Sequence, residues 1–251
     1  MTMRTPRVYL SQPLITGQET RIEASVAHYV LHVLRLTKGS ELRLFNGQGG
    51  AYQATILDTG KHHCIVLVGE AIDNECESPL SVHLGLAIIK KDPMEIAIQK
   101  AVEMGTTQIT PLLTDYTSVK GSMASKRLAH WQGVITSACE QCGRNQLPAL
   151  NPVTPLPNWM DAMKPALQTG TPGIICEPGD EEQTGFVNWP SSPPSDTFLL
   201  IGPEGGFSAT EYQAAISAGF LTLHLGPRIL RAETAVIAAL TCLQQKWGDL
   251  H

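Results

Sequence analysis

The sequence predicts an α/β protein in which a small, strand-rich domain precedes a larger domain of alternating strands and helices. Its 251 residues suffice for one large domain or two modest ones. Strand-like alternation dominates as far as residue 71, whereas strand and helix patterns alternate from residue 82 onward. The alternation of strands and helices in the second region is typical of a parallel sheet covered on both faces. The polar run Ile72–Pro79 separates the two regions, so we expect domains at 1–75 and 76–251.

The N-terminal region reads as a small barrel with one short helix. Glu41–Phe45 and Ala51–Leu57 alternate in character and flank Asn46–Gly50, whose glycines favour a hairpin loop. Cys64–Val68 is expected to form a third strand. Ser25–Leu36 has apolar residues near helical spacing, with its first residue as the N-cap.

The C-terminal region alternates five buried-type strands with four amphipathic helices. The expected strands are Val82–Ile89, Thr107–Leu113, Gly173–Glu177, Thr197–Ile201 and Leu221–Leu225. The expected helices run from Asp92 to Met104, from Ser125 to Gly143, from Ser208 to Gly219 and from Glu233 to Trp247. Capping boxes are expected at Asp92 with Glu95 and at Ser208 with Glu211. The proline-rich segments 145–158 and 178–196 are expected to be loops.

Composition and charge restrict the class of protein. With 43% hydrophobic residues, no apolar run of membrane-spanning length and no secretory signal pattern, we expect a cytoplasmic protein without a membrane partner. The net charge of −5 is concentrated in residues 171–251, which hold three basic and nine acidic residues. Residues 1–75 hold seven of each, so a basic face for nucleic acid remains open there. The six scattered cysteines indicate reduced thiols rather than a disulfide framework.

Two glycine-containing turns follow predicted strands of the second domain. Ligands of parallel α/β sheets bind beyond the carboxyl ends of the strands, where Ile201–Phe207 and Leu225–Ala235 fall. Pro203 removes an amide from the first turn and Glu204 would repel an anion, so this turn is not a phosphate loop. A plain strand-to-helix turn is one interpretation. A backbone approached by a neutral or zwitterionic ligand is the other.

The second turn carries Arg228 and Arg231, two of the three basic residues in the acidic third of the chain. Arginines at the start of a helix oppose the helix dipole, which favours acidic residues there. This arrangement indicates a functional role with an anionic partner.

Read together, these segments resemble a known family of enzymes. The two turns, Leu200–Ser208 and Leu225–Ala235, are similar to motifs of the 16S ribosomal RNA uridine-N3 methyltransferases of the SPOUT superfamily. The resemblance extends in order along nearly the whole chain, through Val33–Leu36, Phe45–Gly50, Gln99–Gly105 and Glu140–Arg144. It implies a PUA-like RNA-binding barrel, then an α/β domain with a deep trefoil knot. It also implies S-adenosylmethionine as methyl donor, 16S ribosomal RNA of the small subunit as substrate, a homodimer and no metal.

The resemblance also implies roles for individual residues. Arg231 is expected to stabilise the uridine anion, Glu140 to accept the N3 proton, and Arg144, four residues further along the same helix, to orient Glu140 or to bind RNA phosphate. The cofactor-binding residues are expected to be Cys176, Glu177, Leu200, Ile201, Gly202, Glu204, Gly205, Gly206, Leu223, Leu225, Gly226, Ile229, Leu230, Thr234 and Ala235. The RNA-binding residues are expected to be Arg7, Arg21, His32, Arg35, Arg43, Lys90 and Lys91.

The last helix is the expected dimer element. Its apolar residues cover more than one face, which suits burial against the protein's own core and against a partner. They are Val236, Ile237, Leu240, Leu243 and Trp247.

Other interpretations remain open from the residues alone. Two alternatives keep the same fold. One is a non-catalytic RNA-binding factor, and the other is a methyltransferase that acts on another RNA. Cys139 and Cys142 have the spacing of a thiol-redox pair, although they lie inside a predicted helix. His28 and His32, one helical turn apart, with His62 and His63 elsewhere, make a metal site conceivable, but an acidic or cysteine ligand is missing nearby. The run 180–182 is expected to be a solvated loop.

Overall fold

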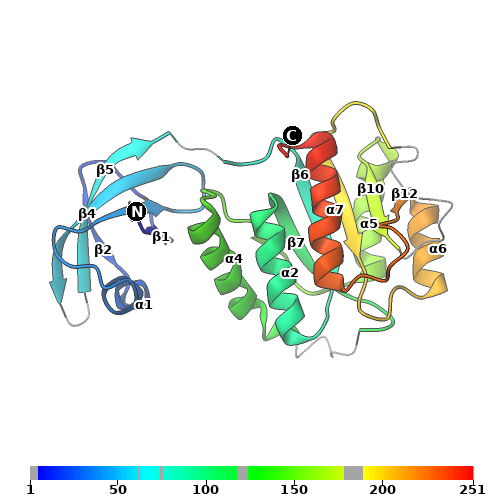
Figure 1. The fold of residues 1–251 in the computed structure, drawn as a ribbon, viewed down its shortest axis with the longest axis horizontal. Coiled ribbons are helices and arrows are strands. Elements are labelled where there is room, and N and C mark those ends of the chain that lie inside the picture. Colours follow the sequence, from blue (N-terminus) through cyan, green and yellow to red (C-terminus); the bar gives the residue numbers. More distant parts are fainter. Residues whose placement is uncertain (1–4, 61–62, 74–75, 118–123, 178–188, 251) are drawn as a thin grey trace. The chain divides into compact units, whose positions relative to one another are not determined.

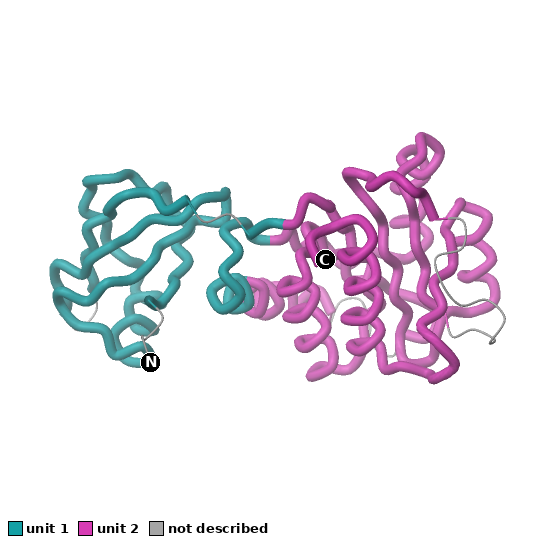
Figure 2. Tube along the Cα trace, turned by 45° about the horizontal axis from the view of Figure 1, so that its top comes forward, with its two compact units in different colours: residues 1–77, 136–147 teal, residues 78–135, 148–251 magenta. Residues whose placement is uncertain are grey.

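The computed structural model describes residues 5–60, 63–73, 76–117, 124–177 and 189–250 and divides the chain into two compact units. Unit 1 contains residues 1–77 and 136–147, and unit 2 contains residues 78–135 and 148–251 (Figure 2). The break near residue 76 follows the polar run of the sequence. The assignment of residues 136–147 to unit 1 was not expected from the sequence. The acidic run 180–182 and His62 lie outside the described residues.

Unit 1 is built on a five-stranded sheet in the order β1-β3-β4-β5-β2. Its strands are β1 (Arg7–Tyr9), β2 (Glu19–Ile22), β3 (Glu41–Phe45), β4 (Ala51–Gly60) and β5 (His63–Ile72). The predicted hairpin is confirmed, because β3 and β4 pair antiparallel with Leu42 opposite Ala54. Alternate residues of the strands, such as Leu42, Leu44, Val66 and Val68, are buried in one apolar core.

The helical segment of unit 1 is shorter and more irregular than expected. Helix α1 (Ala24–His28) passes directly into a π-helical turn, η1 (Tyr29–Val33), closed by a hydrogen bond from Leu34 N to Tyr29 O. Glu23, not Ser25, occupies the N-cap position. Arg35 then adopts φ 55°, a left-handed conformation that ends the helix. Val33, which fits the helical spacing, is 60% exposed.

Unit 2 contains a parallel sheet in the order β12-β10-β11-β6-β7-β8, and β9 also pairs with β7. Its strands are β6 (Ser81–Ala87), β7 (Thr106–Leu113), β8 (Ala149–Leu150), β9 (Thr154–Pro155), β10 (Gly173–Cys176), β11 (Asp196–Ile201) and β12 (Phe220–Leu223). The expected alternation of strands and helices is therefore confirmed. Since the strands are parallel, β10, β11 and β12 all end at the same edge of the sheet.

Helices cover both faces of this sheet, as the sequence pattern predicts (Figure 1). They are α2 (Lys91–Glu103), α5 (Leu156–Gln168), α6 (Ala209–Ala218) and α7 (Ala232–Trp247), whereas α4 (Leu128–Cys142) is divided between the two units. α2 packs against α7, and α5 packs against α6. Trp159 of α5 lies so close to β6 that a Cβ on Gly85 would be 2.9 Å from its ring. A larger residue at Gly85 would therefore displace α5.

In unit 2, one expected helix start is wrong, a second is confirmed, and a helix begins in a segment that was expected to be a loop. Lys90, rather than Asp92, is the N-cap of α2, and its side chain makes no capping bond. Ser208 does cap α6 in a complete capping box with Glu211, and Gly219 ends that helix at φ 101°. α5 begins inside the segment expected to be a loop, with Pro155 at the N-cap. Prolines are tolerated at the start of a helix, where an N–H group has no intrahelical partner, so here they mark a start rather than a loop.

Candidate functional site: a pocket at the carboxyl ends of three strands

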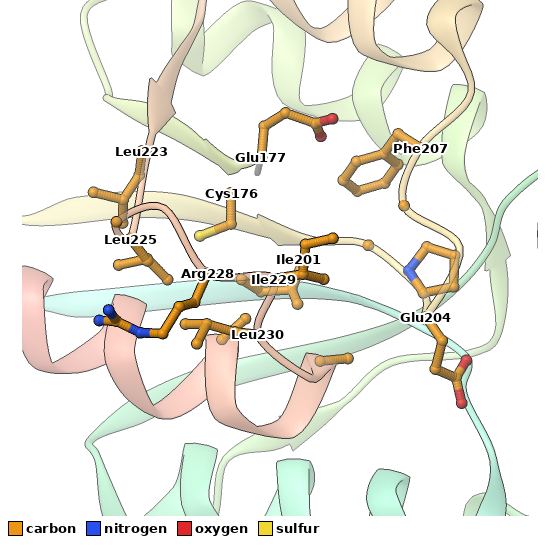
Figure 3. A pocket seen from close by; sticks show the side chains of 16 residues that line it. Cys176, Glu177, Ile201, Glu204, Phe207, Leu223, Leu225, Arg228, Ile229 and Leu230 are labelled. Carbon is orange, nitrogen blue, oxygen red and sulfur yellow. The ribbon is translucent and has the colours of Figure 1, made fainter. Parts of the chain in front are cut away.

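Three chain segments of unit 2 form a pocket beyond the ends of β10, β11 and β12 (Figure 3). One segment ends β10, the second is the turn after β11, and the third is the turn that leads from β12 into α7. Counted out to its open mouth, the pocket has a volume of about 610 Å³. Its lining residues are Cys176, Glu177, Ile201, Gly202, Pro203, Glu204, Gly206, Phe207, Leu223, Leu225, Gly226, Arg228, Ile229, Leu230, Ala232 and Ala235.

Most of the residues expected to bind the cofactor line this pocket. Three do not: Leu200 is buried in the core of the sheet, and Gly205 and Thr234 are exposed. The sequence reasoning missed Pro203, Phe207, Arg228 and Ala232, all of which belong to the two turns already singled out. Their positions next to the motif residues could have identified them, because a turn that surrounds a ligand exposes consecutive residues to it.

Glycine is required at the start of each turn, at Gly202 and at Gly226, for a different structural reason. A Cβ on Gly202 would lie 3.0 Å from the ring of Phe207, so a side chain there would push against the pocket wall. Gly226 has φ +88°, which side chains rarely adopt. Among the described residues, none accepts a hydrogen bond from the backbone N–H groups of Leu225, Gly226 or Leu230. These donors are therefore available to water or to a ligand.

Glu177 is one of two acidic residues that line the pocket, the other being Glu204. Partial burial raises the pKa of the Glu177 carboxyl group, and the nearby His224 opposes this shift. Its Oε2 atom is buried and has no hydrogen-bond partner among the described residues. Figure 3 shows the Glu177 side chain on the same side of the pocket as Phe207. A buried, unpartnered acceptor next to apolar walls suits a ligand that brings its own donors.

Arg231 stands at the N-cap of α7 with an exposed side chain and does not line the pocket. The two turns also carry the carboxylates Glu204 and Glu233, which are the nearest candidates along the motifs to hold the Arg231 guanidinium. Within the described part of the chain, neither carboxylate forms an ion pair with it. Glu204 instead accepts a hydrogen bond from Lys90 N at 3.3 Å. That bond ties the start of α2 to the turn after β11.

Glu140 and Arg144 belong to unit 1, and they do not form the expected pair within one helix. α4 ends at Cys142, so Arg144 lies beyond the helix, where it pairs with Glu77 at 2.7 Å and is nearly completely buried. Glu140 accepts a hydrogen bond from Tyr9 N at 3.0 Å. Burial raises the pKa of its carboxyl group, although that bond and Arg7 act in the opposite direction.

Arg7 is a buried residue of the core of unit 1 rather than an exposed contact for RNA. Only 6% of it is exposed. Its Nη2 donates to Arg144 O at 2.9 Å and to Asn145 Oδ1 at 2.8 Å, and its guanidinium lies over the ring of Phe45. The expectation that Arg7 binds a phosphate is therefore wrong, because a buried guanidinium with these partners is not presented to a phosphate.

The remaining residues expected to contact RNA are accessible. Arg21, His32 and Arg35 are exposed in unit 1, and Arg43 is half-buried on β3. In unit 2, Lys90 and Lys91 are exposed at the start of α2. Lys91 lies within ion-pair distance of Glu95, at 3.9 Å.

The structure favours the ordinary reading of the cysteines and histidines. Burial raises the pKa of the Cys139 thiol to about 12, and its Sγ contacts Gln146 O inside unit 1. Such a thiol is not reactive at neutral pH. The rings of His28 and His32 lie 4.6 Å apart, and no group of three or more metal-ligating side chains occurs among the described residues. In the same part of the chain, no helix has the length and apolar character needed to cross a membrane.

Comparisons with known proteins match both units of the chain. Residues 76–244 match a family model described as an RNA methyltransferase domain, and residues 22–69 match one described as an RNA methyltransferase PUA domain. The ribosomal RNA small subunit methyltransferase E of Buchnera aphidicola (from Schizaphis graminum) is 38% identical, with both chains covered completely. The enzyme of the same name from Synechocystis is 34% identical over 90% of this chain and 75% of its own length.

Solved structures agree with this assignment. A ribosomal RNA small subunit methyltransferase E from Neisseria gonorrhoeae, bound to S-adenosyl methionine, has a TM-score of 0.90 at 34% identity. A Legionella pneumophila protein in complex with the same cofactor has a TM-score of 0.87 at 38% identity. Each covers 99% of this chain and 100% of its own. Full-length similarity at this identity, with both domain models in register, shows that the chain belongs to the family of RNA methyltransferases that includes these ribosomal RNA small subunit methyltransferases E.

Proposed function

We propose that this protein transfers a methyl group from S-adenosylmethionine to N3 of a specific uridine in the 16S ribosomal RNA of the small subunit. One observation carries the proposal. The two glycine turns that suggested the family from sequence meet in a single pocket, in a chain similar along its full length to structures with bound S-adenosylmethionine. The uridine and its N3 atom follow from the family resemblance.

The pocket has properties that suit this cofactor. Leu225, Ile229 and Leu230 offer apolar surface for an adenine, and the free N–H groups of the same turn can bind its ring nitrogens. The unpartnered Oε2 of Glu177 can accept hydrogen bonds from hydroxyl groups or from an ammonium. When bound, S-adenosylmethionine supplies an activated methyl group.

The protein must still activate the uridine. N3 carries a proton at neutral pH and becomes nucleophilic when it loses that proton, which leaves negative charge on the two base oxygens. We assign stabilisation of this charge to Arg231, whose exposed side chain is the cation at the head of α7. Glu140 remains the candidate proton acceptor, and its raised pKa favours that role. Because Arg144 is buried against Glu77, we assign it a positioning role only.

The partners follow from the same proposal. We expect a homodimer in the cytoplasm that binds the small subunit through the exposed cations Arg21, Arg35, Lys90 and Lys91, together with His32 and the half-buried Arg43. The deep trefoil knot remains an expectation from the resemblance.

Labelled-methyl transfer tests the proposal directly. Small subunits from a strain that lacks this methylation are incubated with the protein and methyl-labelled S-adenosylmethionine, and the nucleosides are then separated. The expected product is 3-methyluridine. Label in a different nucleoside would overturn the assigned chemistry, and binding of subunits without any transfer would favour a non-catalytic RNA-binding factor.

A further inference from the structure

Tyr116 is an exposed aromatic residue beside the pocket that neither the sequence motifs nor the reaction chemistry uses. It is 57% exposed and lies in the turn that follows β7. A Cβ built on Gly205 would lie 3.4 Å from Tyr116 Cβ and 3.6 Å from its Cδ2. Gly205 in turn lies between Glu204 and Gly206, both of which line the pocket. The ring is therefore packed beside the turn that forms one wall of the proposed cofactor site.

The turn that carries Tyr116 is held by hydrogen bonds within itself and from α6. Thr117 N donates to Thr114 O, and the two threonine hydroxyls lie 2.9 Å apart. Asp115 N donates to Glu211 Oε1 at 2.8 Å, and Ser208 Oγ donates to Asp115 Oδ2 at 2.6 Å. Glu211 and Ser208 are also the two members of the capping box of α6. The capping box therefore fixes the tyrosine turn and the end of the pocket turn relative to each other.

Such an arrangement places an exposed aromatic ring at a defined position. A single exposed apolar residue is common on protein surfaces and needs no explanation. Tyr116 differs because its backbone is held in place and because it borders the wall of a ligand pocket. An aromatic ring fixed in advance loses little conformational freedom when a flat ligand stacks on it.

We propose that Tyr116 is a stacking platform for a base of the substrate RNA at the edge of the cofactor pocket. This inference rests on the proposed function. β7 and β11 both end at the edge of the parallel sheet where ligands of such folds bind, so a base stacked on Tyr116 lies beside the methyl donor's site. Aromatic stacking holds single-stranded bases without reading their hydrogen-bonding edges, which leaves the N3 edge of a uridine free for methylation.

The test compares three variants of the full-length protein, with small subunits as the RNA substrate and saturating S-adenosylmethionine. Tyr116→Ala should raise KM for the subunit about five- to hundredfold, the range that loss of one stacked base produces. Tyr116→Phe keeps the ring and should stay within about twofold of the wild type. Ile216→Ala, which shortens a partly exposed apolar side chain on α6, is the matched control and should leave KM unchanged. Calorimetric affinity for S-adenosylmethionine should be the same in all three.

The possible failures are distinguishable. If the wild-type protein transfers no methyl group, the proposed function fails, and the Tyr116 platform, which rests on it, fails as well. If the wild type is active and Tyr116→Ala retains its KM, the platform is overturned. A Phe variant as weak as the Ala variant overturns stacking in favour of the hydroxyl group. Loss of cofactor affinity in parallel with KM would make Tyr116 a support of the pocket turn instead.

Discussion

The buried Arg144 and the partly buried Glu77 form an ion pair inside unit 1, with Arg144 Nε and Nη2 each 2.7 Å from Glu77 Oε2. The second oxygen, Oε1, accepts hydrogen bonds from the backbone N–H groups of Asn145 and Gln146, both at 3.1 Å. One carboxylate therefore holds three consecutive residues of the segment 136–147. This segment also contacts the hairpin loop after β3, because Leu147 N donates to Gly47 O. The residues that follow the Glu140–Arg144 motif thus contact the Phe45–Gly50 motif.

Replacement of Glu77 should destabilise the protein strongly. Glu77→Ala leaves the buried guanidinium of Arg144 without its counter-ion, a change that typically costs about 3–5 kcal/mol. Urea unfolding measures the loss. Asp161→Ala, which breaks the exposed pair with Lys164, is the control and should change stability by less than about 1 kcal/mol. Equal effects of the two substitutions would contradict a structural role for the Glu77 pair.

Gly226→Val should abolish binding of S-adenosylmethionine. Valine is β-branched and cannot adopt φ +88° without strain, so the turn that lines the pocket must change shape. Gly219→Val is the matched control, because Gly219 has φ +101° but ends α6 and does not line the pocket. Calorimetry should find binding in the control and none in Gly226→Val. Retained binding in Gly226→Val would remove the turn from the site.

Arg231→Ala should lower kcat about 10²–10³-fold while affinity for S-adenosylmethionine stays within a few-fold of the wild type. The expected cause is the loss of an interaction that strengthens as the uridine becomes anionic. Arg231→Lys keeps the charge but loses the planar donor geometry, so it should be impaired as well. Single-turnover methylation gives the rate and calorimetry gives the affinity. A loss of affinity that matches the loss of rate would make Arg231 a structural residue.

Glu177→Gln should make the free protein more stable at neutral pH and weaken its binding of the cofactor. Burial raises the pKa of this carboxyl group, so the folded state binds the proton more tightly than the unfolded state does. Its contribution to stability is therefore complete below the ordinary glutamate value of 4.5 and is lost as the pH rises through the folded-state pKa.

Thermal unfolding between pH 4 and pH 8 measures the direction of this pH dependence of stability. The Gln variant should gain Tm relative to the wild type towards pH 8 and lose that advantage towards pH 4. A Gln variant that is less stable than the wild type at pH 8 would mean that the ionised carboxylate is satisfied in the folded protein.

Ile237→Lys is the appropriate test of the proposed dimer. Val236, Leu240, Leu243 and Trp247 of α7 are buried within the chain itself, whereas Ile237 is 37% exposed. A lysine at Leu243 would unfold the protomer, but a lysine at Ile237 would place a charge in a contact between copies and leave the protomer's core intact. Light scattering should find a monomer for Ile237→Lys and a dimer for the wild type. A wild-type monomer would refute the dimer.

The sequence predicted elements wherever local chemistry decides the structure. Ser208, Glu211 and Gly219 define both ends of α6 by capping geometry alone, and the strands on either side of Asn46–Gly50 pair as expected. It failed where a local signal has two meanings. The prolines before α5 suit a helix start as well as a loop, and only packing of Trp159 against the sheet distinguishes them.

The residues of the candidate site likewise fall into those that local signals predict and those that they do not. Both glycine turns line the pocket, because glycine, proline and chain order are local signals. The partners of Arg7 and Arg144 were not predictable, since Arg7 and Asn145 are 138 residues apart and burial decides whether an arginine meets solvent or the core. Charge counts, together with the resemblance to a family with an RNA-binding barrel, suggested an RNA contact for Arg7.

The division of unit 1 between residues 1–77 and 136–147 has a consequence for the way this protein is made. A ribosome synthesises the chain from its N-terminus, and domains generally fold as units during synthesis. The first 77 residues are synthesised early. The ion pair of Glu77 with Arg144 and the hydrogen bond from Tyr9 N to Glu140, however, need residues that are synthesised later. These contacts can therefore form only after residue 144 has emerged, when more than half of the 251 residues have been translated. A fragment cut at residue 75 or 77 would therefore keep the strands of unit 1 and lack the contacts that residues 136–147 supply.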